Sequence, residues 1–193
     1  NKNFEYRVCV DTSPLMEKHW GQKAGLGWIG KHTNLINSKI GTWFFLSEII
    51  IDFELEFNKP YTYDLCGSCT KCIDACPTEA LEDYVLDANK CISYLTIEHR
   101  ESIPKSLSEK INNWIYGCDI CQEVCPWNLK YEQLTEDINF KKRLEIDNKT
   151  DSDWENLSVE DYQKSFKKSS IKRTKYSGIT RNILAAKQNK NLD

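Results

Sequence analysis

The chain has 193 residues, of which 40% are hydrophobic and 28% charged, and its formal net charge is −3. This composition is ordinary for a globular protein and excludes a fibrous or low-complexity chain. The longest apolar run, Trp43–Leu46, is far too short to span a bilayer, so we expect no membrane segment.

Nine cysteines are the unusual feature of the composition, and eight of them fall between Cys66 and Cys125. A secreted disulfide framework usually has an even number of cysteines in a shorter chain. The odd count and the clustering indicate metal ligands in a reducing compartment. Cys9 lies outside the cluster and is expected to be a free thiol.

The first predicted element is a strand over Phe4–Asp11, because apolar and polar residues alternate along it. Its apolar face, expected to be buried, consists of Phe4, Tyr6, Val8 and Val10. Ser13 and Pro14 then suit the N-cap and first position of a helix. That helix is expected to run to about Ala24, where Gly25 can end it.

The next segment, Gly25-Leu-Gly27-Trp-Ile-Gly30, matches the G-x-G-x-x-G pattern of dinucleotide-binding loops. That pattern requires a strand before it and a helix after it, whereas here the predicted order is reversed. The glycines therefore indicate a tight turn or a close approach of the backbone to something flat and bulky. His32 follows and is interpreted as a structural hydrogen-bonding residue.

A β-hairpin is predicted next, with strands over Thr33–Ile36 and Thr42–Ile51 around a turn at 37–41. Residues 52–63 are interpreted as a linker.

The cysteine module begins with Cys66-Gly-Ser-Cys69-Thr-Lys-Cys72-Ile-Asp-Ala-Cys76-Pro77. This is the C-x2-C-x2-C-x3-C-P run of bacterial two-cluster ferredoxins, in which the fourth cysteine binds the other cluster. The spacing predicts two [4Fe–4S] clusters.

The second run, Cys118-Asp-Ile-Cys121-Gln-Glu-Val-Cys125-Pro126, has only the last three cysteines of the pattern, and Cys91 is left to supply the missing ligand. Exchange of the fourth cysteines predicts two ligand sets. The first is Cys66, Cys69, Cys72 and Cys125, and the second is Cys76, Cys91, Cys118 and Cys121. The alternative is a pair of four-cysteine zinc sites, which usually use well-separated C-x2-C pairs.

Charge is unevenly distributed after the cysteines. Residues 132–161 hold ten acidic and four basic residues, whereas residues 164–190 hold nine basic residues and no acidic one. Residues 162–188 are predicted to form one or two basic helices. The basic side chains of such helices can form a solvated surface or a site that binds phosphate groups.

Four segments together resemble the epoxyqueuosine reductase family. They are Val10–Glu17, Ala24–Thr33, Cys91–Glu98 and Gly117–Asn128. The resemblance covers nearly the whole chain and extends to the tail around Arg173 and Arg181. It implies a cytoplasmic enzyme that reduces the epoxide of epoxyqueuosine in tRNA, using cobalamin and two [4Fe–4S] clusters. The family's chains continue further at the N-terminus, so this chain is expected to be a fragment lacking that part.

The resemblance also implies roles for individual residues. Asp11 would donate a proton to the departing epoxide oxygen, and a carboxyl in an apolar pocket can stay protonated near neutral pH. The expected corrin contacts are Leu35, Leu46, Ile49 and Ser93. The expected tRNA contacts are Arg100, Lys172, Arg173 and Arg181. An external one-electron donor of the ferredoxin or flavodoxin type and a monomeric state are also expected.

The predicted fold class is α+β, in three parts. Residues 1–60 would be the C-terminal part of an α/β cobalamin-binding domain, 61–130 a ferredoxin-like module with two [4Fe–4S] clusters, and 131–193 a helical region that contacts tRNA. Two other functions share parts of this plan: a cobalamin-dependent reductive dehalogenase, and a two-cluster electron carrier with no catalytic site.

Overall fold

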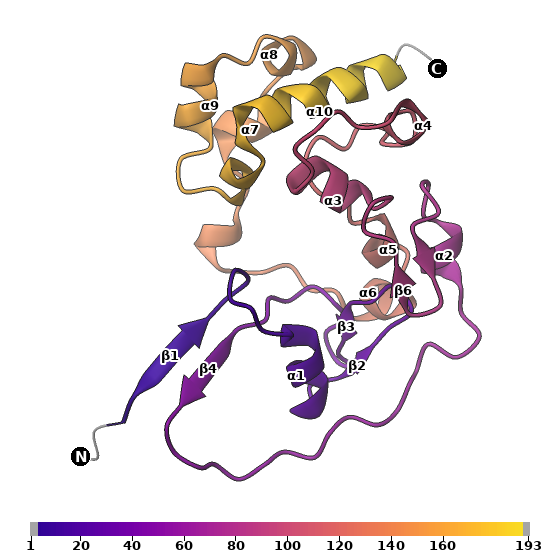
Figure 1. Ribbon diagram of the computed structural model, residues 1–193, viewed down its shortest axis with the longest axis vertical. Coiled ribbons are helices and arrows are strands. Elements are labelled where there is room, and N and C mark those ends of the chain that lie inside the picture. The colour runs from indigo at the N-terminus through magenta and orange to yellow at the C-terminus, as the bar shows by residue number, and fades with distance from the viewer. Residues whose placement is uncertain (1–3, 191–193) are drawn as a thin grey trace. The chain divides into compact units, whose positions relative to one another are not determined.

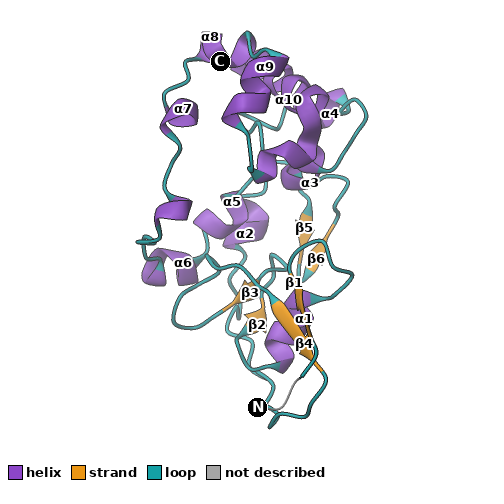
Figure 2. Cartoon of the chain, turned by 90° about the vertical axis from the view of Figure 1, so that its left-hand side faces the viewer, coloured by secondary structure: helices purple, strands orange, loops and turns teal. Residues whose placement is uncertain are grey.

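The computed structural model describes residues 4–190 and divides them into two compact units. Unit 1 comprises residues 4–75, 81–85 and 121–133. Unit 2 comprises residues 76–80, 86–120 and 134–190. The mixture of short strands and helices is visible in Figure 2 and agrees with the predicted α+β class.

The strands are short, and all of the pairings are two-stranded. They are β1 (Tyr6–Cys9), β2 (Trp28–Ile29), β3 (Leu35–Ile36), β4 (Glu48–Ile51), β5 (Leu81–Glu82) and β6 (Val85–Leu86). Figure 1 shows β1 and β4 as one antiparallel ribbon, in which Val8 lies opposite Ile49 and Cys9 opposite Glu48.

Unit 1 also holds the short helices that carry or follow cysteines. They are α1 (Glu17–Lys23), α2 (Lys71–Asp74) and α6 (Pro126–Tyr131), with α5 (Ile120–Glu123) beginning at the boundary between the units.

Three local predictions for unit 1 are wrong. The predicted hairpin is reduced to one antiparallel bridge, between Asn37 and Gly41, because β3 pairs with β2 and β4 pairs with β1. The first helix begins at Glu17 rather than at Ser13-Pro14, although it ends at Lys23 with Ala24 as its C-cap, before Gly25, close to the expected end. The predicted apolar face of the first strand is exposed, and Cys9 on the other face is buried. The tertiary pairing of β1 with β4 outweighs the local pattern.

Unit 2 is mainly helical. Its elements are α3 (Ile92–Ile97), α4 (Lys105–Ser108), the 3-10 helix η1 (Ile138–Phe140), α7 (Leu144–Asp147), α8 (Asp151–Glu155), α9 (Val159–Ser165), the 3-10 helix η2 (Ser170–Thr174) and α10 (Lys175–Lys190). Thr150 and Asp153 form a reciprocal capping box at the start of α8. The predicted basic helices correspond to η2 and α10, because α9 has Glu160 and Asp161 in its first turn and one basic residue, Lys164.

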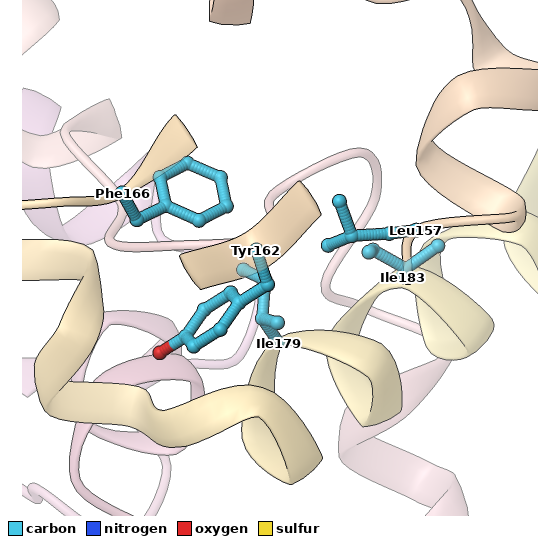
Figure 3. Close-up of a cluster of buried hydrophobic side chains, with 5 residues drawn as sticks. All are labelled: Leu157, Tyr162, Phe166, Ile179 and Ile183. Carbon is cyan, nitrogen blue, oxygen red and sulfur yellow. The ribbon is translucent and has the colours of Figure 1, made fainter. Parts of the chain in front are cut away.

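The core of unit 2 forms where α10 packs against the segment around α9. Ile179, Asn182, Ile183 and Ala186 are buried at helical spacing along α10. Figure 3 shows Ile179 and Ile183 beside Leu157 and the rings of Tyr162 and Phe166. This apolar contact fixes one face of α10, which leaves the basic residues of the segment on other faces. No helix among residues 4–190 is long and apolar enough to cross a membrane.

Candidate metal centre

Four cysteines of unit 1 line a single cavity of about 230 Å³. They are Cys66, Cys69, Cys72 and Cys125, the first of the two predicted ligand sets. Cys66 and Cys69 lie in the loop before α2, and the Cys69 amide donates to the Cys66 carbonyl at 3.1 Å. Cys125 comes from the far end of the module, as the N-cap residue of α6. Three of the thiols are thus close together in the sequence, and the fourth reaches the cavity only when the chain folds.

Two thiols of this cavity, those of Cys72 and Cys125, have raised pKa values. Burial, with smaller contributions from Cys125 and Cys66, raises the pKa of the Cys72 thiol to about 11. Burial, Cys66 and Cys69 likewise raise the pKa of Cys125. Metal binding requires deprotonated thiols, so a strongly cationic centre has to displace these protons. The donor set suits an iron–sulfur cluster, whose iron ions supply that charge.

The glycine-rich loop places an indole group against one of the cysteines of this cavity. Trp28, on β2, is 1% exposed, and its Nε1–H donates to Cys66 Sγ at 3.4 Å. A side chain at Gly27 would collide with the carbonyl oxygen of Ile36 on the neighbouring strand. The loop lies between α1 and β3, the order that argued against a dinucleotide site. Gly27 allows close approach to the neighbouring strand, and Gly25, at a φ of +80°, allows the turn that follows α1.

His32 and Lys31 also line the cavity. His32 is 3% exposed, and its Nδ1 accepts the Asn34 amide hydrogen at 3.1 Å, so the predicted structural hydrogen bond is present. Burial, assisted by Lys18, lowers the pKa of His32 to about 4, so the ring is neutral at physiological pH. Lys31 is buried and pairs with Asp83, with 3.3 Å between Nζ and Oδ2.

Asn128, three residues after Cys125, ties this ligand to the loop at Thr42. Asn128 is fully buried; its Oδ1 accepts the Thr42 amide hydrogen at 2.6 Å, and its Nδ2 donates to Thr42 Oγ1 at 2.7 Å and to the Gln122 carbonyl at 2.8 Å. Gly41 has a φ of +73°, and a side chain there would meet Asn128. No pattern in the sequence indicates this anchor beyond its place in the cysteine motif.

The second predicted set has three of its cysteines in unit 2. Cys118 is electrostatically coupled to Cys91 and Cys76, and burial, followed by these neighbours and Asp119, raises its pKa to about 11. Cys76 Sγ accepts the Ala80 amide hydrogen at 3.4 Å. Cys121, the fourth member, lies on α5 three residues after Cys118.

A buried polar network supports Cys91 and Cys118. Thr96 on α3 accepts the Gly117 amide hydrogen at 2.9 Å, and its carbonyl accepts hydrogen bonds from Thr174 and Asn182 at 2.8 Å. Asn182 also donates to the Ile115 carbonyl at 2.9 Å. These bonds connect α10 to the helix that follows Cys91 and to the loop that precedes Cys118.

Within residues 4–190, no group of three or more His, Cys, Asp or Glu side chains is placed to hold a single metal ion. A four-iron cluster is larger than one ion and needs its thiolates distributed around a cube.

Asp11 is exposed and lies just after β1, at a φ of +51°. Aspartate tolerates this left-handed conformation better than most residues do. The expected apolar pocket around its carboxyl is not formed by the described residues, because the side chain is exposed.

The expected corrin contacts occupy different environments. Leu35 is buried and Leu46 half-buried, and both lie beside Gly21 on α1. Ile49 is exposed on β4. Ser93, in unit 2, follows Cys91 by two residues on α3.

The expected tRNA contacts differ in how they are held. Arg173 Nε lies 2.5 Å from Glu98 Oε1, and an Arg100 guanidinium nitrogen lies 3.9 Å from the other oxygen. Lys172 lies over the Tyr162 ring, 5.1 Å from its centroid. Arg181 instead donates to the carbonyls of Leu95, His99 and Glu101 at 2.6–2.8 Å. Its guanidinium therefore holds the end of α3.

Comparison with known proteins agrees with the cysteine spacing. Residues 65–128 match the 4Fe-4S double cluster binding domain family. An epoxyqueuosine reductase of Leadbetterella byssophila is 49% identical over 183 residues, which are 94% of this chain and 59% of that protein. The chain thus spans about three-fifths of this relative's length.

Solved structures give the same result. A crystal structure of epoxyqueuosine reductase with an epoxyqueuosine-modified tRNA-Tyr stem loop matches with a TM-score of 0.83 and 29% identity, over 96% of this chain and 49% of that one. The Bacillus subtilis enzyme, solved with an aspartate catalytic loop swung out of the active site, matches with a TM-score of 0.82 and 27% identity, over 98% and 50%. In sequence and in fold, more than nine-tenths of the chain is therefore similar to part of the epoxyqueuosine reductases.

Proposed function

We propose that this chain is the electron-delivering part of an enzyme that reduces epoxyqueuosine to queuosine in tRNA. The observation that carries the proposal is the cavity lined by Cys66, Cys69, Cys72 and Cys125, in a chain that matches epoxyqueuosine reductases over more than nine-tenths of its length. The double cluster domain supports electron transfer through iron–sulfur clusters.

The reaction converts an epoxide to an alkene and consumes two electrons and two protons, and the epoxide oxygen leaves as water. Each [4Fe–4S] cluster passes one electron at a time, so an acceptor that can hold two is needed. Cobalamin supplies this chemistry when bound, because cobalt can store both electrons. Residues 1–60 would contribute to its domain, with Leu35 and Leu46 as apolar contacts from unit 1 and Ile49 and Ser93 as further contacts.

Asp11 is proposed to deliver the proton that the departing oxygen takes up. Its position at a strand end, in a strained backbone conformation, is typical of functional loops. The aspartate loop described for the Bacillus subtilis relative supports this assignment.

The remaining partners follow the same plan. Residues 131–193 would contact tRNA through Lys172 and Arg173 at the surface, with Arg100 as a further contact, whereas Arg181 would act by holding α3. Electrons would come from a ferredoxin or flavodoxin type of donor, and the enzyme would act as a cytoplasmic monomer.

The test is anaerobic reconstitution of the holoenzyme with iron, sulfide and cobalamin, followed by assay on epoxyqueuosine-containing tRNA. Formation of queuosine supports the proposal. Binding of iron without cobalamin uptake would favour an electron carrier, and turnover of an organohalide instead of the tRNA would favour a dehalogenase.

The division of the eight cysteines into two ligand sets predicts the effect of removing one cysteine. The reconstituted protein should hold about eight irons, two clusters of four. Cys91→Ala should lose one cluster and keep the other, because Cys91 belongs only to the set with Cys76 and Cys118. Iron analysis and the EPR spectrum of the reduced protein measure this. Cys9→Ala is the control and should keep both clusters. Loss of both clusters in Cys91→Ala, or of neither, contradicts the partition.

If the basic residues of the C-terminal segment, 164–190, bind tRNA phosphates, then removing two of them should change the salt dependence of tRNA binding. Lys172→Ala with Arg173→Ala should weaken binding and reduce the slope of log K against log salt by about 2, roughly one for each lost phosphate contact. The control is Lys141→Ala with Lys142→Ala, which removes the same charge from the acidic segment. If the two double variants have equal slopes of log K against log salt, then Lys172 and Arg173 belong to an ordinary solvated surface and do not contact phosphates.

A further inference from the structure

The free nitrogen of His32 is the unexplained polar group of the cysteine cavity. Nε2 is buried, and among residues 4–190 it has no hydrogen-bond partner. A buried polar group without a partner is destabilising, so a position of this kind indicates a group that the protein alone does not supply. The His32 ring lines the cavity that the four thiols of the first set also line.

The hydrogen bond at the other ring nitrogen decides what Nε2 can do. Nδ1 accepts the Asn34 amide hydrogen, so it carries no proton of its own. A neutral imidazole has one donor and one acceptor nitrogen, which makes Nε2 the donor. The nearby Lys18 amine donates to the carbonyl of Thr33 and to the side chain of Asn34, and its positive charge disfavours a second proton on the ring.

The polar groups of Trp28, behind Cys66, and of Lys31, on the cavity wall, are also a donor and a cation. Trp28 donates to the Cys66 sulfur, and the buried Lys31 ammonium is partly offset by Asp83. A cluster gains a negative charge when it is reduced, and hydrogen bonds to its sulfur atoms are among the factors that set its potential. These donors therefore favour the reduced form of a cluster bound in the cavity.

We propose that His32 donates a hydrogen bond from Nε2 to a sulfur atom of the cluster bound by Cys66, Cys69, Cys72 and Cys125, and thereby raises the reduction potential of that cluster. This inference rests on the proposed function, because it requires an iron–sulfur cluster in the cavity. His32 is a positioning residue in this role. It transfers no proton and binds no iron.

The test is an EPR-monitored redox titration of the reconstituted holoenzyme and its variants. His32→Phe keeps a ring but removes the donor, and it should make reduction of one cluster about tenfold less favourable. That is a shift of about 59 mV to lower potential for a one-electron couple. The potential of the other cluster should stay the same. His32→Gln restores an N–H donor and should recover most of the shift. His19→Phe, an exposed histidine of the same unit, should leave both potentials unchanged.

A second measurement needs no substitution. In protein labelled with ¹⁵N-histidine, pulsed EPR of the reduced cluster should show a weak coupling to one histidine nitrogen. Absence of that coupling in the wild type, or unchanged potentials in a His32→Phe protein that retains its iron, overturns the inference. Iron content is measured first: a wild-type protein that binds no iron refutes the proposed function, whereas one with full iron content and no histidine coupling refutes only the role of His32.

Discussion

Replacing Asp11 by Asn in the holoenzyme is expected to lower turnover per bound cobalamin by about 10²–10⁴-fold, the usual contribution of a general acid. Asparagine has nearly the same shape and also tolerates the left-handed backbone found at Asp11, so the loop should keep its conformation. What it lacks is a transferable proton for the departing epoxide oxygen. Cobalamin content and queuosine formation are measured on the same sample.

The matched control is Asp52→Asn, at an exposed aspartate just after β4 in the same unit. It should keep wild-type turnover. If Asp11 has only a structural role, activity will fall in proportion to cobalamin occupancy. Activity per bound cobalamin within about twofold of wild type in Asp11→Asn would mean that the proton comes from another group.

The second large effect is expected at Asn128. Asn128→Leu has a similar volume but leaves the buried Thr42 amide without its acceptor and removes the two hydrogen bonds donated by Nδ2. The Gln122 carbonyl keeps the Cys125 amide as a partner. An unsatisfied buried donor costs about 1–3 kcal/mol and each lost hydrogen bond about 0.5–1.5 kcal/mol, so we expect the free energy of unfolding to fall by roughly 2–6 kcal/mol. Cys125 lies one helical turn away, and iron retention in the first cavity should decrease as well. Urea unfolding followed by circular dichroism measures the loss of stability.

Two variants make the Asn128 result specific. Asn128→Asp keeps an oxygen for the Thr42 amide but loses the two Nδ2 donations, so it should be intermediate. Asn58→Leu changes an exposed asparagine in the same unit and should stay within about 0.5 kcal/mol of wild type. An Asn128→Leu protein as stable as the Asn58 variant would show that the network does not hold Cys125 in place.

The spacing of Cys66, Cys69 and Cys72 is a local constraint that can be recognised in the sequence, and the structure brings these three residues around one cavity with Cys125. Strand pairing is decided by distant residues. The Thr33–Ile36 and Thr42–Ile51 segments both have the composition of strands, but nothing in their pattern reveals that β3 pairs with β2.

Buried polar residues were the other limit of sequence reasoning. Asn128 and Asn182 are fully buried, yet asparagine is most often found at the surface. Arg181 lies in a basic segment, and its expected role was a contact with tRNA. Its carbonyl partners come from residues about eighty positions earlier in the chain. Such roles depend on which backbone groups lack partners after folding, and a single sequence does not display them.

The indole groups beside the first cavity provide an optical signal of its contents. Trp28 donates to the Cys66 sulfur, and the ring of Trp127, 5.0 Å from that of Trp28, lines the same cavity. An iron–sulfur cluster absorbs light across the near-ultraviolet and visible range, so it takes up the excitation energy of indoles so close to it. The intrinsic fluorescence of these two residues is therefore low when the cavity is filled and rises when iron is lost. Assembly and decay of one particular cluster can be followed in real time, in the unlabelled protein.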